Sequence, residues 1–209
     1  MLTWKHSIFN SCVSIQSQKL LVGLTGGIAC GKSTALNVFG ELGWETISSD
    51  AIVADLLDKN EGVKHSIKTN LGPSLLVNDE VDKKKVAEVI FNNSEAKTWL
   101  ENLLHPLVRE TWQRLVAISD KEHVVVEIPL LFEKNLKDLF QITVCVQCKK
   151  TIQLQRLHDR GLTKAQSNAR IESQMSLNEK IRLADIVLLG DHSLLFLKQQ
   201  IEHFHANYT

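Results

Sequence analysis

The sequence has no excess of charge of either sign, because its 209 residues include 24 lysines and arginines against 24 aspartates and glutamates. With a formal net charge of zero, no field of the whole molecule attracts nucleic acid or an acidic membrane surface. The sequence also lacks any apolar run near the roughly 18 residues that a membrane-spanning helix needs. We therefore expect neither a nucleic-acid partner nor a membrane partner, and the oligomeric state stays open.

Cysteine is also scarce, and Cys12, Cys30, Cys145 and Cys148 show no repeating spacing. A chain of this length builds its own core without the disulfide framework of small secreted proteins, so we expect a cytoplasmic location. Cys145 and Cys148 form a single C-x-x-C at the end of an apolar run, without the second pair that a zinc site requires. We interpret them as structural thiols rather than as redox or metal-binding groups.

Residues 1–19 contain no acidic residue, several serines and two lysines. This composition faintly resembles a transit peptide, but the segment has no arginine and no clean apolar core. We expect a short N-terminal extension rather than a targeting signal.

What the sequence does contain is a complete G-x-x-x-x-G-K-[ST] motif from Gly26 to Ser33, directly behind the apolar run 20–24. Gly26 and Gly31 let the backbone curl so that successive amide groups converge on one anion. Lys32 can reach the β- and γ-phosphates, the Ser33 hydroxyl can ligate Mg²⁺, and the following helix directs its positive end at the same charge. The motif predicts a nucleotide-binding protein.

Strand and helix signals alternate along the chain. The apolar segments that predict strands are 20–24, 46–47, 123–128, 141–146 and 185–189. Helical patterns lie between them, the first over residues 33–42. Apolar strands separated by helices indicate an α/β fold, a doubly wound parallel sheet of five strands that binds its ligands at the carboxyl ends of the strands.

Two helical regions interrupt this alternation. Between residues 59 and 119 apolar residues recur at steps of three and four, without evident strands, which predicts a helical insertion. Residues 151–180 are helical and carry arginines, so they are a candidate lid. The nucleotide-binding core is then expected to comprise residues 20–58, 120–150 and 181–209.

Acidic and basic side chains that can take part in catalysis lie in both regions. Asp50 follows the second expected strand, where its carboxylate can accept a proton from an attacking hydroxyl. It can equally well be the cap of a helix over residues 51–57. Arg156 and Arg160 are spaced to share a helix face and close over the phosphates. The alternative is a solvated charged helix face with Asp159 as a partner.

Several further motifs, in their order and spacing, carry a family resemblance. They are the phosphate loop, Ser49-Asp50-Ala51, His105-Pro106-Leu107-Val108-Arg109, Ile128-Pro129-Leu130-Leu131-Phe132-Glu133, Gln155-Arg156-Leu157, Arg170-Ile171-Glu172-Ser173-Gln174-Met175 and Ala184-Asp185. From about Leu20 to Ser193 the chain resembles the dephospho-CoA kinase family. The H-P-x-V-R and I-P-L-L-F-E segments are more specific to that family than the loop.

The resemblance implies a P-loop fold like that of the nucleoside monophosphate kinases. It also implies transfer of the γ-phosphate of ATP, with Mg²⁺, to the ribose 3′-hydroxyl of dephospho-CoA, which forms coenzyme A and ADP. It makes Asp50 the general base, assigns Lys32 to the phosphates and Ser33 to Mg²⁺, and assigns Arg156 and Arg160 to the lid. The implied ATP-binding residues are Gly26, Gly27, Ala29, Cys30, Gly31, Lys32, Ser33 and Thr34.

For the acceptor, the resemblance implies binding by the inserted helices, with His105 and Arg109 in that region. A histidine before a proline is also an ordinary place for one helix to end and another to begin, so His105 has a structural interpretation as well.

The chain departs from the family pattern in three segments. Ser48 replaces the first aspartate of the usual D-A-D after the second strand, which leaves Asp50 as the remaining acid. Ala29-Cys30 replaces a glycine-serine pair in the loop. Gly190-Asp191-His192-Ser193 replaces an asparagine-x-glycine-serine segment near the adenine, which makes nucleotide selectivity less certain.

Other functions are compatible with a phosphate loop. A GTPase would carry Asn-Lys-x-Asp, whereas Asn135-Leu136-Lys137-Asp138 has these letters in the wrong order. Another small-molecule kinase, acting on adenylate or shikimate, would share the fold and need a different acceptor pocket. The non-enzymatic alternative is an ATP-binding switch that transfers no phosphate, and such a switch does not need the Asp50 carboxylate.

Overall fold

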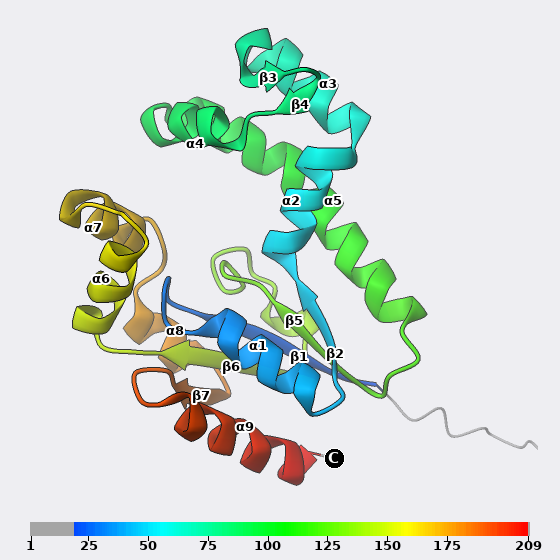
Figure 1. The fold of residues 1–209 in the computed structure, drawn as a ribbon. Helices are drawn as coiled ribbons and strands as arrows, with labels where there is room; N and C mark the ends of the chain where they lie inside the picture. Colours follow the sequence, from blue (N-terminus) through cyan, green and yellow to red (C-terminus); the bar gives the residue numbers. More distant parts are fainter. Residues whose placement is uncertain (1–18, 209) are drawn as a thin grey trace, which may run out of the picture.

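The structure, a computed structural model, describes residues 19–208, so the N-terminal extension expected over residues 1–19 lies outside the described residues except for Lys19. Its centre is a parallel sheet of five strands in the order β2-β5-β1-β6-β7 (Figure 1). The strands are β1 (Leu20–Gly26), β2 (Glu45–Ser48), β5 (His123–Glu127), β6 (Ile142–Gln147) and β7 (Ile186–Leu189). This confirms the predicted α/β fold class and all five expected strands of the sheet.

Helices cover the sheet and form the two regions that project from it (Figure 1). They are α1 (Lys32–Glu41), α2 (Ser49–Lys59), α3 (Glu61–Asn70), α4 (Lys83–Asn92), α5 (Ser94–Ile118), α6 (Lys150–Asp159), α7 (Lys164–Glu172), α8 (Leu177–Leu183) and α9 (Leu194–Tyr208), with short 3₁₀ turns at Pro73–Leu75 and Lys137–Leu139. Among residues 19–208, no helix combines the length and the apolar character that crossing a bilayer requires.

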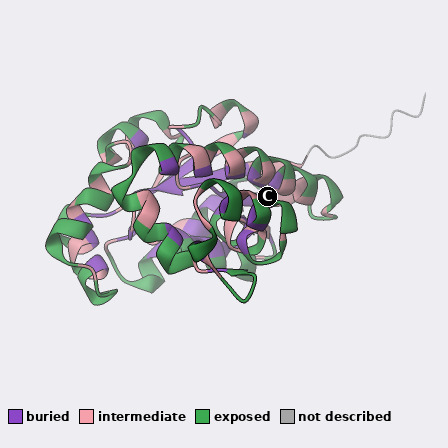
Figure 2. Cartoon of the chain, turned by 90° about the horizontal axis from the view of Figure 1, so that it is seen from above, coloured by how far each residue is buried: buried purple, intermediate pink, exposed green. Residues whose placement is uncertain are grey.

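The sheet buries both of its faces, and Figure 2 shows the buried residues gathered in the strands and on the inner sides of the helices. Alternate residues of β5 point to opposite faces. Val125 packs in the cluster that contains Phe39 of α1 and Ile201 of α9, whereas Val124 packs in the cluster that contains Trp112 of α5. Each such fully buried side chain contributes about 1.5–3 kcal/mol. This two-sided burial fixes the phosphate loop at the carboxyl edge of a rigid sheet.

The insertion has a hydrophobic cluster of its own, to which α2, α3, α4 and α5 contribute. It also contains a short antiparallel pair, β3 (Leu76–Val77) and β4 (Glu80–Val81), so the expectation of helix without strands was wrong here. The turn between the strands places Asn78 and Asp79 at φ 53° and 62°, a conformation that these two residue types tolerate well. Strands of two residues are too short to show an alternating pattern.

Helix α5 joins the insertion to the core without a break at His105-Pro106, so the alternative interpretation of His105 as a helix boundary was wrong. The Asn93 side chain caps the helix by accepting hydrogen bonds from the Glu95 and Ala96 amides, at 2.9 and 3.0 Å. Pro106 removes one backbone hydrogen bond, but buried side chains on both sides of it hold the helix together. As a result, His105 and Arg109 lie one turn apart on one rigid helix.

Candidate active site

The loop between β1 and α1 has the curled backbone that its motif requires. Gly26 and Gly31 have φ values of 144° and 103°, which residues with a Cβ rarely adopt. A Cβ on Gly26 would also lie 2.2 Å from the Val146 carbonyl oxygen of the neighbouring strand β6. This close approach of loop and sheet requires a glycine at position 26, and a curled loop of this kind is able to present backbone amides to an anion.

Lys32 lies at the centre of this loop and is only 9% exposed. Its ammonium group donates a hydrogen bond of 3.1 Å to the Gly27 carbonyl oxygen. Burial lowers the pKa of Lys32, while the negative charges of Glu127, Cys30 and Asp50 oppose that shift. A buried cation of this kind favours an anionic ligand beside it. Ser33 is exposed in the first turn of α1, where its hydroxyl is accessible to a metal ion.

Glu127, at the end of β5, is a second carboxylate at the loop that the sequence analysis did not assign to the site. It is 3% exposed, and the Ser48 hydroxyl donates a 3.4 Å hydrogen bond to it. Burial raises the pKa of Glu127, the charge of Lys32 lowers it, and the charge of Asp50 raises it further. The sequence feature that could have indicated Glu127 is an acidic residue directly after three valines, at the end of a strand. Ser48, at the end of β2, stands where the family pattern has an aspartate, but Glu127 supplies a carboxylate at the end of the neighbouring strand β5.

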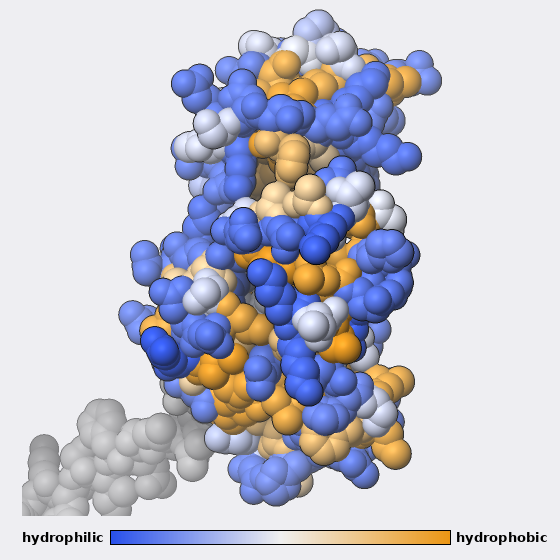
Figure 3. Space-filling view, turned by 90° about the vertical axis from the view of Figure 1, so that its left-hand side faces the viewer, coloured by the Kyte–Doolittle hydropathy of each residue, from blue (hydrophilic) through white to orange (hydrophobic). Residues whose placement is uncertain are grey.

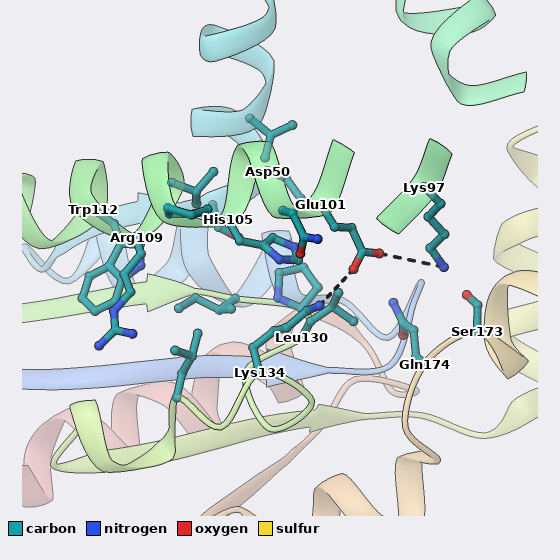
Figure 4. A pocket seen from close by; sticks show the side chains of 18 of the residues that line it. Asp50, Lys97, Glu101, His105, Arg109, Trp112, Leu130, Lys134, Ser173 and Gln174 are labelled. Atoms are coloured by element: carbon teal, nitrogen blue, oxygen red, sulfur yellow. Dashed lines mark hydrogen bonds and ion pairs between the residues drawn. The ribbon is translucent and has the colours of Figure 1, made fainter. Parts of the chain in front are cut away.

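Asp50 lies in the first turn of α2 and is exposed, with its side chain lining a pocket together with Lys32 (Figure 4). The alternative that Asp50 caps this helix was wrong. The cap is Ser48, whose hydroxyl accepts a hydrogen bond of 3.4 Å from the Ala51 amide. The Asp50 carboxylate therefore faces the space in front of the phosphate loop.

The pocket has a volume of about 750 Å³, within the usual range for small-molecule sites. It extends from the loop along α5 and the segment after β5. Its lining includes Ile28, Lys32, Asp50, Lys97, Glu101, His105, Arg109, Trp112, Ile128, Leu130, Lys134 and Gln174. Figure 4 shows His105, Arg109 and Trp112 projecting from successive turns of α5. Figure 3, which looks onto the lid side of the molecule, shows hydrophobic surface between hydrophilic atoms below the insertion.

Charged side chains surround His105 in this pocket. Lys134 donates a 2.9 Å hydrogen bond to Glu101, and Lys97 lies 4.0 Å from the same carboxylate (Figure 4). Burial lowers the pKa of His105, Lys134 lowers it further, and Glu101 opposes them. These effects together favour the neutral imidazole over its charged form. The place of Lys97 and Lys134 in the pocket could not be predicted from the sequence, because lysines on helices and loops are common on any protein surface.

The two lid arginines have different surroundings. Arg156 of α6 donates to the carbonyl oxygens of Ala29, at 3.0 Å, and Gly190, at 2.8 Å. The proposed partner Asp159 instead accepts a hydrogen bond from Gln155, so the alternative of a solvated pair was wrong for Arg156. Arg160 lies just beyond the end of α6 and is exposed. The structure thus brings Arg156, but not Arg160, against the phosphate loop.

Lys180 and Glu133 connect the candidate lid, residues 151–180, to the sheet. Lys180 is fully buried, lies 2.8 Å from a Glu133 carboxylate oxygen and donates a 2.6 Å hydrogen bond to the Pro129 carbonyl oxygen. The same Glu133 carboxylate accepts a 3.0 Å hydrogen bond from the Met175 amide. These contacts fix the point where the lid returns to the sheet.

A family model and curated relatives place the chain in one family. The family model described as dephospho-CoA kinase matches residues 20–195. A dephospho-CoA kinase of Legionella pneumophila strain Paris is 36% identical over 189 residues, covering 90% of this chain and 94% of the relative. A solved dephospho-CoA kinase of Campylobacter jejuni has a TM-score of 0.68 and 32% identity, over 90% of this chain and 96% of that one. A Thermus thermophilus crystal structure gives a TM-score of 0.79 at 29% identity, over 92% and 99%.

Proposed function

The chain belongs to the dephospho-CoA kinase family, and on that premise we propose that it transfers the γ-phosphate of ATP to the ribose 3′-hydroxyl of dephospho-CoA. The products are coenzyme A and ADP. One observation in particular supports this function: a single pocket runs from Lys32 of the phosphate loop, past Asp50, to His105 and Arg109 of α5. Donor and acceptor can therefore meet at the carboxylate of Asp50.

The donor side of this pocket uses backbone amides and cations. The amides of the curled loop and the Lys32 ammonium group bind the ATP phosphates, and the positive end of α1 adds to their field. Ser33 would hold Mg²⁺, which neutralises charge on the β- and γ-phosphates when it is bound with ATP. The negative charge of buried Glu127 opposes the lowering of the Lys32 pKa by burial, and so favours the charged form of that lysine.

The acceptor side lies on α2 and α5. The Asp50 carboxylate takes the proton of the attacking hydroxyl, because an alcohol is a poor nucleophile until its proton is removed. Arg109 supplies a fixed positive charge for an anionic acceptor. Neutral His105 offers a hydrogen bond without adding charge. Arg156 keeps the lid on the loop while the phosphoryl group moves.

An acceptor panel tests the function directly. The protein is mixed with Mg-ATP and, separately, with dephospho-CoA, adenosine, AMP or shikimate, and the release of ADP and the mass of the acceptor are measured. We expect ADP release together with a gain of one phosphoryl group on dephospho-CoA alone. Phosphorylation of AMP or shikimate instead would support another small-molecule kinase. ATP binding without transfer to any acceptor would support a nucleotide-dependent switch.

Replacing Arg109 tests the acceptor site. We expect Arg109→Ala to raise the KM for dephospho-CoA by about tenfold or more, the effect of losing one charge-assisted contact, with little change in the KM for ATP. His105→Ala should also raise the KM for dephospho-CoA. Arg114→Ala, on the same helix but outside the pocket, is the matched control. An Arg109 variant with an unchanged KM for dephospho-CoA would remove this residue from the acceptor site.

We also retain, as proposals, a cytoplasmic location and the absence of nucleic-acid and membrane partners. The scarce and irregularly spaced cysteines support the location, and the formal net charge of zero supports the absence of both partners.

A further inference from the structure

Two thiols meet beneath the phosphate loop. Cys30, in the loop, is 0% exposed, and Cys148, just after β6, is 4% exposed. Their sulfur atoms are 3.3 Å apart although the residues are separated by 118 positions in the chain. The sequence analysis paired Cys148 with Cys145 in a C-x-x-C, but Cys145 is buried within strand β6. Cys148 instead contacts the loop.

The sheet holds this pair together. Strands β1 and β6 are parallel neighbours, and Gly26 at the end of β1 is in register with Val146 of β6. The loop and the segment after β6 therefore leave the sheet at the same edge. Both sulfurs are attached to short segments anchored at that edge, so their approach is part of the fold.

The surroundings of the two sulfurs are unequal. The hydrogen bond with Cys148 lowers the pKa of Cys30 most, burial opposes that shift, and the positive charges of Lys32 and Arg156 lower it further. The hydrogen bond with Cys30, together with burial, raises the pKa of Cys148. Cys30 is therefore the sulfur that ionises first and reacts as the nucleophile.

We propose that Cys30 and Cys148 form a reversible disulfide when the protein meets hydrogen peroxide, and that this disulfide inactivates the phosphate loop. The Cys30 thiolate attacks one peroxide oxygen, the O–O bond breaks and a sulfenic acid forms on Cys30. The hydroxide that leaves takes up the proton that Cys30 lost on ionising and becomes water. The Cys148 sulfur then attacks the Cys30 sulfur, the S–O bond breaks, and the proton of Cys148 leaves with the hydroxyl as water. In total, two thiols lose two electrons and one peroxide becomes two waters.

The disulfide changes the loop because its backbone has no free space at this point. A disulfide is about 2.05 Å long, so the sulfurs must approach by more than 1 Å. The Cys30 carbonyl oxygen already packs against Gly190, where an added Cβ would lie 2.0 Å from it. Arg156 holds the preceding carbonyl, that of Ala29. Movement of Cys30 therefore displaces the amides that bind phosphate. The loss of activity depends on the proposed binding of ATP at the loop, whereas formation of the disulfide does not.

Peptide mapping of the full-length protein tests the linkage. Reduced protein is treated with hydrogen peroxide, its remaining thiols are blocked with N-ethylmaleimide, and it is digested with trypsin. Cleavage after lysine releases Cys30 in fragment 20–32, Cys145 and Cys148 together in fragment 138–149, and Cys12 in fragment 6–19. We expect fragments 20–32 and 138–149 to be joined in the wild type and in the control Cys145→Ala, but not in Cys148→Ala or Cys148→Ser. A link to fragment 6–19, a link within fragment 138–149, or no link overturns the proposal.

ATP binding, measured by titration on the same samples, tests the switch. Peroxide should weaken ATP binding by about tenfold or more in the wild type and in Cys145→Ala, and dithiothreitol should restore it. Both Cys148 variants should bind ATP normally before and after peroxide. A linked protein that binds ATP normally, or equal loss of binding in the Cys148 variants, overturns the switch. If the reduced protein binds no ATP, that result contradicts the proposed function and not the disulfide. Peptide mapping then still tests whether Cys30 and Cys148 are linked.

Discussion

Asp50→Asn is expected to lower kcat by about 10²- to 10⁴-fold, the range for removal of a positioned general base. The amide is almost the same size as the carboxylate but cannot accept the proton of the attacking hydroxyl. ATP affinity should change little, because Asp50 lies on α2 across the pocket from the loop amides. The measurements are steady-state kinetics with dephospho-CoA and a separate ATP titration.

The control for Asp50 is Asp55→Asn, which makes the same change of charge on the same helix outside the pocket. Its kinetics should match those of the wild type. Glu127→Gln distinguishes the role of Glu127 from that of Asp50, the other carboxylate near Lys32. Because Glu127 is buried near the lysine, its replacement should mainly affect ATP binding. Unchanged kcat in Asp50→Asn, or a loss of kcat confined to Glu127→Gln, would assign the base elsewhere.

Arg156→Ala is expected to lower kcat by up to about 10³-fold, the lower limit for arginine groups that stabilise a transferring phosphoryl group. The variant loses the positive charge near the phosphates and both hydrogen bonds to the carbonyls of Ala29 and Gly190. Arg156→Lys should recover part of the activity, since it keeps the charge but cannot donate to two carbonyls in the same fixed geometry. Rapid-quench or steady-state kinetics measure both variants.

Arg160 provides the second half of this experiment. We expect Arg160→Ala to lower kcat as well, if the lid closes further over bound ATP. The control is Arg182→Ala, which removes an exposed arginine of α8. Wild-type rates in both the Arg156 and the Arg160 variants would contradict the assignment of residues 151–180 as a functional lid.

Local patterns were sufficient to predict the elements of the core. Strands β1, β5, β6 and β7 are rich in apolar residues, as burial on both faces of a parallel sheet requires, whereas the edge strand β2 has only Ile47 as an apolar residue. The phosphate loop was evident because its glycines must stand at fixed spacing for the backbone to curl. The family resemblance, now confirmed by the family model over residues 20–195, rests on motifs of the same local kind.

Contacts between distant segments could not be predicted in this way. The place of Glu127 beside Lys32 depends on which strands are neighbours, and the contact of Arg156 with the loop depends on how α6 leaves the sheet. The continuity of α5 through Pro106 was decided by the packing of buried side chains on both sides of it, which outweighs one lost backbone hydrogen bond.

The sequence by itself determined the sheet, the phosphate loop and the family, because these depend on residue types at fixed spacings along one segment. Only the tertiary structure decided that Asp50 lines a pocket together with Lys32, and that Cys30 meets Cys148. The physical reason is that such contacts depend on the order of strands in the sheet. Neighbouring strands such as β1 and β6 end at the same edge, however far apart they lie in the chain.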